Sequence, residues 1–248
     1  MQLKNNLQLL GLSLFSVAFM SWTINKIESV SDHYNSEVHY LSETTAVSNP
    51  EPGSSAYVYD SLSLEEKGLS HEAFDYAIQG FEKLMEEHLL QNDSILTIID
   101  FDQPSYKKRL YVIDVRNYKV LFNTLVAHGK NTGKEEAVSF SNAKESNKSS
   151  LGFYLTDVTY TGSKGYSLKL RGLEKNINSN AFARAIVMHG ARYVSQSLID
   201  EQGYIGRSLG CPAVPVEWSQ PIIQTIKNGS CLFIYNKSYK PSSFLQNS

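Results

Sequence analysis

The sequence predicts a mainly β, α+β domain with an amphipathic helix in front of it. Short runs rich in β-branched and aromatic residues are separated by Gly, Asn and Ser turns, and one stretch ahead of them has helical apolar spacing. Strands do not alternate regularly with long helices, which argues against a doubly wound α/β sheet. The predicted strands cover residues 95–101, 110–115, 120–126, 152–159, 167–173, 185–188 and 231–235.

The composition is that of an ordinary globular protein. The 248 residues are 42% hydrophobic and include 15 Gly and 7 Pro, which excludes collagen, extended low complexity and a polytopic membrane protein. Lys and Arg number 23 and Asp and Glu 25, so no global positive field is present to hold nucleic acid. Two cysteines make neither a disulfide framework nor a zinc site, and no metal site is predicted.

Residues 1–25 have the pattern of an export segment. Residues 7–24 carry no acidic or basic side chain and follow Lys4. A signal peptide needs an apolar stretch of about 7–15 residues and a spanning helix about 20, so a cleaved signal and an N-terminal membrane anchor both fit. Ser16 and Ala18 form a small-x-small pattern that favours cleavage. We expect export to the periplasm or cell envelope.

Three further segments follow the export segment. Residues 26–69 are polar and contain Pro50 and Pro52, which predicts a linker. Residues 70–240 form the globular domain, and residues 241–248 a C-terminal tail. Ser70 is placed to cap the first helix of the domain. The apolar stripe of that helix comprises Phe74, Ala77, Ile78, Phe81, Leu84, Met85 and Leu89.

Residues 206–210 fit the G-x-S-x-G pattern of the α/β-hydrolase nucleophile elbow. That fold places its histidine after the serine, whereas the last histidine of this chain is His189. Pro212 and Pro215 follow at once and block the immediate helix that an elbow requires. We therefore reject Ser208 as a nucleophile.

Cys211 is the stronger nucleophile candidate. It stands between Gly210 and Pro212, where glycine allows an unusual turn whose N–H groups converge on an oxyanion. A thiol nucleophile needs a base, and His189 is 22 residues earlier, at the end of a predicted strand and before Gly190. Taken alone, a Cys and a His also fit a buried thiol and a hydrogen-bonded structural histidine.

His128 and Cys231 leave alternatives open. His128 follows a predicted strand and precedes a turn, so it either lines a substrate cleft or is a structural histidine. No spacing rule supports a metal held by His128, His189 and Cys211. Cys231 opens an apolar run and is expected in a core strand, although a disulfide to Cys211 would disable the thiol.

The order H-G, loop, S-x-G-C resembles the active-site signature of the L,D-transpeptidases of the YkuD type. The ending GRSLGCPAVP is similar to the branch known as the murein L,D-transpeptidase catalytic domain family. Further blocks have the look of that branch, in its order: ILTIIDFDQPS, LFNTLVAHGKNTG, YTGSKGYSLKLRGLE and RAIVMHGA. The likeness covers about residues 70–236 and implies a β-sandwich-like catalytic domain.

The resemblance implies a cysteine acyl-enzyme acting on peptidoglycan stem peptides without a cofactor. Cys211 would attack the carbonyl before a terminal D-alanine, and His189 would act as base and then acid, its other nitrogen held by a carbonyl near Gly190. Gly210 and Cys211 would supply the oxyanion hole, and Ser208 would shape the substrate site. The acceptor would be a neighbouring stem or a wall-linked protein.

Two positions depart from the family pattern. Leu209 stands where many members have histidine, and Ala213 where many have arginine. Arg207 would replace the missing positive charge by binding a substrate carboxylate, or would instead be a structural bridge.

Three functions therefore compete. The leading one is an exported L,D-transpeptidase. An L,D-carboxypeptidase or endopeptidase would pass the same acyl-enzyme to water, and a noncatalytic wall-binding domain would keep only the fold.

Overall fold

The computed structural model describes residue 51 and residues 53–246. The predicted export segment and most of the predicted linker lie outside these residues. Within them, no helix is both long and apolar enough to cross a membrane. The elements in chain order are α1 (Ser55–Ser61), α2 (His71–Glu86), β1 (Ile95–Asp100), β2 (Leu110–Asp114), β3 (Lys119–Thr124), β4 (Gly152–Gly162), β5 (Gly165–Gly172), β6 (Val187–Gly190), α3 (Gln196–Gln202), β7 (Ala213–Val214), α4 (Val216–Ile226), β8 (Cys231–Tyr235) and α5 (Ser243–Gln246).

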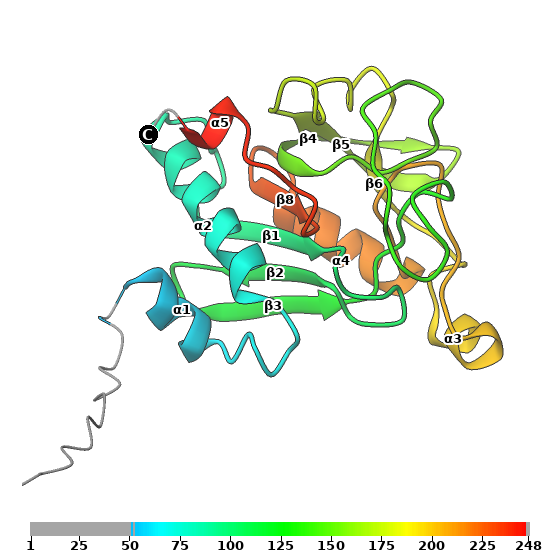
Figure 1. Cartoon of the computed structure of the whole chain (residues 1–248), viewed down its shortest axis with the longest axis horizontal. Helices are drawn as coiled ribbons and strands as arrows, with labels where there is room; N and C mark the ends of the chain where they lie inside the picture. The colour runs from blue at the N-terminus through cyan, green and yellow to red at the C-terminus, as the bar shows by residue number, and fades with distance from the viewer. Residues whose placement is uncertain (1–50, 52, 247–248) are drawn as a thin grey trace, which may run out of the picture. The chain divides into compact units, whose positions relative to one another are not determined.

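The domain is α+β, as the sequence predicts, and is built on one sheet of eight strands (Figure 1). The strand order is β3-β2-β1-β8-β4-β5-β6-β7. Most neighbours are antiparallel, while β1–β8 and β6–β7 are parallel. An isolated bridge between Ala127 and Ala213 joins the chain after β3 to β7, so the two ends of the strand order meet and the sheet is nearly closed.

Helix α2 forms for the reasons visible in the sequence. The Ser70 side chain accepts a hydrogen bond from the Ala73 N–H at 3.2 Å, which caps the helix. The predicted stripe is buried from Phe74 to Leu84 and packs against β1 and β8. Met85 and Leu89 are 38% and 44% exposed, because the helix ends at Glu86.

The predicted linker extends too far toward the domain. Residues 55–61 form α1, and the following turn contributes buried side chains to the core rather than a polar tether. The Tyr59 hydroxyl donates to the Leu69 carbonyl, and the Tyr111 hydroxyl donates to the Lys67 carbonyl at 2.7 Å. The apolar residues are spaced within a polar stretch, which hides this short helix in the sequence.

The C-terminal boundary also differs from the prediction. Residues 243–246 form α5 instead of a plain tail, and the Phe244 ring lies 5.1 Å from the Phe153 ring. Helix α5 contacts α2, as Figure 1 shows. The globular domain therefore takes in chain on both sides of the predicted 70–240 range.

Helix α4 follows the prolines that exclude an elbow. It begins directly after Pro215, which is its N-cap, and contains Pro221. Its buried residues Ser219, Ile222, Ile223 and Ile226 have helical spacing, and they pack the helix against β6, β1 and β5. No helix follows Ser208 directly, so the structure agrees with the rejection of the elbow.

Candidate active site

The parallel pairing of β6 with β7 brings the two key residues together. His189 is opposite Ala213 in this ladder. Extending the same register places Val187 opposite Cys211, and the Val187 N–H lies 3.5 Å from the Cys211 Sγ. Alternate residues of a strand project to the same side, so Val187 and His189 share a face. Two residues 22 positions apart thus become neighbours across one strand pair.

The Cys211 thiol is protonated at neutral pH in this environment. Burial raises the pKa of the thiol, while the Val187 N–H and the charges of Arg184 and Lys164 partly oppose that rise. Cys211 and Cys231 are both free, and Cys231 is buried in β8. The disulfide alternative is therefore absent from the structure, and the thiol needs a base to become a nucleophile.

His189 has the state that a general base requires. The side chain is 3% exposed, and its Nδ1 lies 3.0 Å from the Gly190 carbonyl oxygen. A carbonyl can only accept, so we assign the proton to Nδ1 and the free lone pair to Nε2. Burial lowers the pKa of His189, and the Lys164 charge lowers it further. The hydrogen bond to the Gly190 carbonyl raises this pKa but does not offset the other two effects. The imidazole is accordingly neutral at neutral pH.

The turn before Cys211 is held by Ser208. The Ser208 hydroxyl donates to the Cys211 carbonyl at 2.6 Å and accepts from the Gly210 N–H at 3.0 Å. This corrects the expected oxyanion hole, because the Gly210 N–H already has a partner. Within the described residues the Cys211 N–H has no hydrogen-bond acceptor, so it is the donor left for an oxyanion. Ser208 is only 5% exposed and shapes the turn rather than a substrate surface.

Gly210 is required by the close approach of a second loop. Its φ is +123°, and a Cβ there would lie 2.8 Å from the Lys148 carbonyl oxygen. The Ser149 hydroxyl donates to the Gly210 carbonyl at 3.2 Å. Arg184 fixes this loop by donating to the carbonyls of Ser141 and Lys148. Nothing local in the sequence marks Arg184 as a neighbour of the thiol, so its role is visible only in the fold.

His128 does not line the cleft, contrary to the predicted substrate-binding role. It is fully buried, its Nδ1 accepts from Arg109 at 2.8 Å, and its Nε2 lies 3.3 Å from the Gly133 carbonyl oxygen. Burial and the Arg109 charge lower the pKa of His128 to about 3, so the ring stays neutral. The Ser208 N–H donates to the His128 carbonyl at 2.9 Å, so this histidine supports the turn from behind.

Arg207 takes the structural alternative. Its guanidinium donates to the carbonyls of Lys130 and Gly133 at 3.4 and 3.2 Å. These bonds tie the turn before Cys211 to the loop after His128. One guanidinium nitrogen of Arg207 is therefore engaged with backbone, as its structural alternative predicts, while the side chain remains exposed.

A cavity of about 470 Å³ opens beside His189 and Gly190. It is lined in part by Lys164 of the β4–β5 turn and by Arg192 and Tyr193, which follow β6. Burial raises the pKa of Tyr193 to about 12, so its hydroxyl stays protonated. Sequence reasoning missed these residues because they come from separate strand ends that meet only in the fold.

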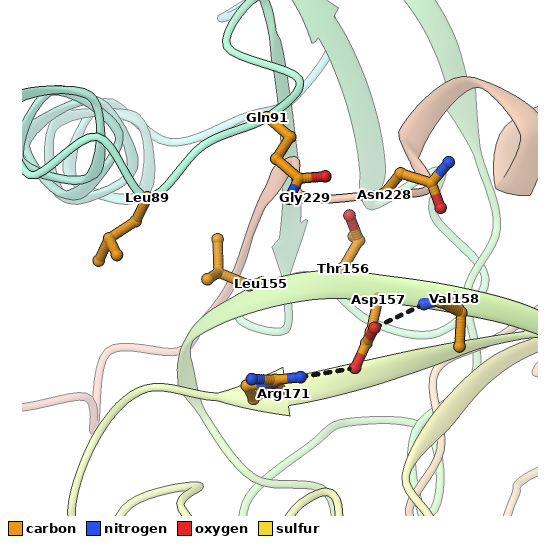
Figure 2. Close-up of a pocket in the computed structure, with 9 residues that line it drawn as sticks. All are labelled: Leu89, Gln91, Leu155, Thr156, Asp157, Val158, Arg171, Asn228 and Gly229. Atoms are coloured by element: carbon orange, nitrogen blue, oxygen red, sulfur yellow. Dashed lines mark hydrogen bonds and ion pairs between the residues drawn. The ribbon is translucent and has the colours of Figure 1, made fainter.

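A second pocket lies elsewhere and contains none of the predicted site residues (Figure 2). It is lined by residues of β4 and β5 and by the turn before β8. Asp157 accepts from Arg171 at 3.0 Å and from the Val158 N–H at 2.8 Å, so its charged groups are already satisfied. No cluster of three His, Cys, Asp or Glu side chains suited to a metal occurs in the part of the chain that the structure describes.

A free thiol and a neutral imidazole brought together by one strand pair, with the Cys211 N–H unpaired among the described residues, supply the groups that a cysteine-dependent acyl transfer needs. Residues 65–235 match the family model for the L,D-transpeptidase catalytic domain, YkuD_2. This match spans more than half of the chain, and the chain belongs to that family.

Solved structures of L,D-transpeptidases are distant from this chain. The enzyme from Mycobacterium smegmatis is 12% identical with a TM-score of 0.37, and the match covers 58% of this chain and 59% of that chain. The enzyme (Yku) from Stackebrandtia nassauensis is 14% identical with a TM-score of 0.34, covering 73% and 77%. The chain thus spans about six-tenths of the first of these structures. No curated protein matches it.

Proposed function

We propose that this chain is an exported, cysteine-dependent murein L,D-transpeptidase that acts on peptidoglycan stem peptides and releases D-alanine. The supporting observation is the β6–β7 register, which brings the Cys211 thiol to the Val187 N–H, two residues before a neutral His189 whose Nδ1 is held by the Gly190 carbonyl. Membership of the L,D-transpeptidase catalytic domain family supports the same reaction class.

The acylation step follows from the assigned protonation states. His189 Nε2 takes the thiol proton as Cys211 Sγ attacks the carbonyl carbon that precedes the terminal D-alanine. The developing oxyanion accepts from the Cys211 N–H. When the tetrahedral intermediate collapses, the C–N bond breaks and His189 gives its proton to the departing D-alanine amine. A thioester on Cys211 remains.

The second half returns the enzyme to its starting state. The side-chain amine of a neighbouring stem, or of a wall-linked acceptor, attacks the thioester carbonyl while His189 removes its proton. A new amide forms, the C–S bond breaks, and the thiolate recovers the proton from His189. Water in place of the amine would give the carboxypeptidase or endopeptidase outcome.

The test is mass analysis of disaccharide-tetrapeptide incubated with the full chain. We expect a cross-linked dimer that lacks one D-alanine, formed by the wild type and by Cys231→Ala but not by Cys211→Ser. Cys231→Ala is the matched control because it removes the other cysteine, which is buried in β8. A shortened monomer alone would replace transpeptidation by hydrolysis. Equal product from Cys211→Ser would refute the cysteine mechanism.

A further inference from the structure

The cavity beside His189 has an unbalanced charge. Its lining includes two cationic side chains and contains no aspartate or glutamate. The nearest acidic residue in sequence, Glu217, lines a different pocket with Pro215 and Trp218. The polar side chains of the lining are Ser163, Lys164, Tyr166, His189, Arg192, Tyr193 and Ser219. Such a cavity favours an anionic group over a neutral or cationic one.

Two arginines of the neighbouring loops are hydrogen-bonded within the fold, whereas the two cations of the cavity lining are not. Arg184 and Arg207 donate to backbone carbonyls of neighbouring loops. By contrast, Lys164 and Arg192 form no hydrogen bond or ion pair with any other described residue. An exposed guanidinium and an exposed ammonium that line one cavity without partners are donors suited to a carboxylate.

Lys164 also lies near the two side chains that react in the proposed mechanism. Lys164 is close enough to the reacting groups that its charge lowers the pKa of both His189 and Cys211. In the proposed reaction the leaving nitrogen must come within hydrogen-bond reach of His189. When the leaving group is a terminal amino acid, its carboxylate is attached to the carbon next to that nitrogen. Because His189 lines the same cavity as Lys164 and Arg192, a carboxylate one carbon from that nitrogen is within the region that the two cations border.

We propose that Lys164 and Arg192 form a carboxylate subsite that selects peptides whose cleaved residue is the last one. This inference rests on the proposed function and deepens it. An internal peptide bond or a C-terminal amide leaves the two cations unpaired, so both are disfavoured. An acceptor whose amine and carboxylate share one carbon uses the same subsite after D-alanine has left.

The test compares two tetrapeptides that differ only at the C-terminus, one a free acid and the other a primary amide. We expect the wild type to prefer the acid in kcat/KM on the order of tenfold, as for charge-assisted bonds in a partly exposed cleft. The double variant Lys164→Gln/Arg192→Gln should lose this preference mainly by slowing turnover of the acid. Lys119→Gln, which removes a charge at the start of β3, is the matched control and should keep it.

A binding measurement separates this subsite from the reaction itself. Calorimetric titration of Cys211→Ala with both peptides should show tighter binding of the acid, and the two added glutamines should abolish the difference. If neither peptide is turned over by the wild type but the acid still binds better, the proposed function fails and the subsite stands. Equal binding of acid and amide by Cys211→Ala, or an unchanged preference in the double variant, would overturn the subsite.

Discussion

At the residue scale, environment and not residue type separates the two His-Gly pairs of this chain. His128 has both ring nitrogens engaged, by Arg109 and by the Gly133 carbonyl. His189 has only Nδ1 engaged, by the Gly190 carbonyl. A base needs a nitrogen without a partner, so of these two histidines only His189 fits the role of base in the proposed reaction. Both residues follow a strand in the sequence, which gives no hint of this difference.

The pKa of Cys211 leads to a prediction at the same scale. Because burial raises this pKa above the ordinary 9.0, the thiolate should form only in alkaline solution. The rate of Cys211 alkylation by iodoacetamide should therefore rise with pH through a midpoint above 9.0. The alkylation rate at each pH is measured by mass spectrometry of samples that are quenched at set times. Cys211→Ala, which keeps only the buried Cys231, should stay unmodified while folded.

A different profile would contradict this protonation state. A stable thiolate–imidazolium pair would give an alkylation rate that is already high and flat near pH 7. That result would mean that attack begins from a preformed ion pair, and that His189 is not a neutral base in the resting protein.

At the element scale, glycine decides how closely α2 packs on the sheet. Gly80 faces β4, and a Cβ there would lie 2.1 Å from the Phe153 ring. The ring cannot move aside easily, because it is fully buried and stacked on Phe233 at a centroid distance of 4.2 Å. The apolar stripe of the helix is visible in the sequence, but this contact with a strand more than 70 residues later is not.

Gly80→Ala should therefore destabilise the protein. Alanine favours the helix by about 1 kcal/mol, while overpacking a well-filled core costs about 1–3 kcal/mol. We expect the overpacking to win and the free energy of unfolding to fall, as measured by urea denaturation followed by circular dichroism. The exposed neighbour supplies the control, since Gln79→Ala should change stability by less than about 0.5 kcal/mol. A Gly80→Ala variant of unchanged or higher stability would show that the Phe153 ring can move aside for the added methyl group.

At the scale of the whole molecule, the domain extends beyond its most recognisable sequence blocks. The segment from α1 to Ser70 buries five apolar side chains, namely Val58, Tyr59, Leu62, Leu64 and Leu69. The Tyr59 ring stacks on His71 at 3.7 Å and packs against Phe74 at 5.4 Å between ring centroids. Each buried apolar side chain contributes about 1.5–3 kcal/mol, so together they rival the whole stability of a typical domain.

Removing this segment should accordingly unfold or severely destabilise the protein. A chain that begins at residue 51 should keep the thermal midpoint of the full chain, whereas one that begins at residue 70 should lose a cooperative transition near that temperature. Scanning calorimetry of the three chains measures this. Equal midpoints for the chains beginning at 51 and 70 would show that α1 is dispensable, as the predicted linker would have implied.

The α+β class, the main strands, helix α2 and the family could all be predicted from the sequence, because they depend on local periodicity and on contiguous motifs. The sequence also named Cys211 and His189 as candidates, because Gly210 precedes the thiol and because His189 ends a predicted strand 22 residues earlier. Short elements such as α1 and β7 were not predicted, because their stability comes from tertiary packing and their local sequence patterns are weak.

Which polar groups around the thiol keep a free donor or acceptor depends on contacts that form only in the folded chain. The fold engages the Gly210 N–H, His128 and Arg207 in internal hydrogen bonds, and it brings Lys164 and Arg192 to a cavity beside His189. A donor or acceptor is available to a substrate only where it is not already hydrogen-bonded within the protein. Those partners come from distant strand ends, so the nearly closed sheet, and not the local sequence, sets the chemistry of the site.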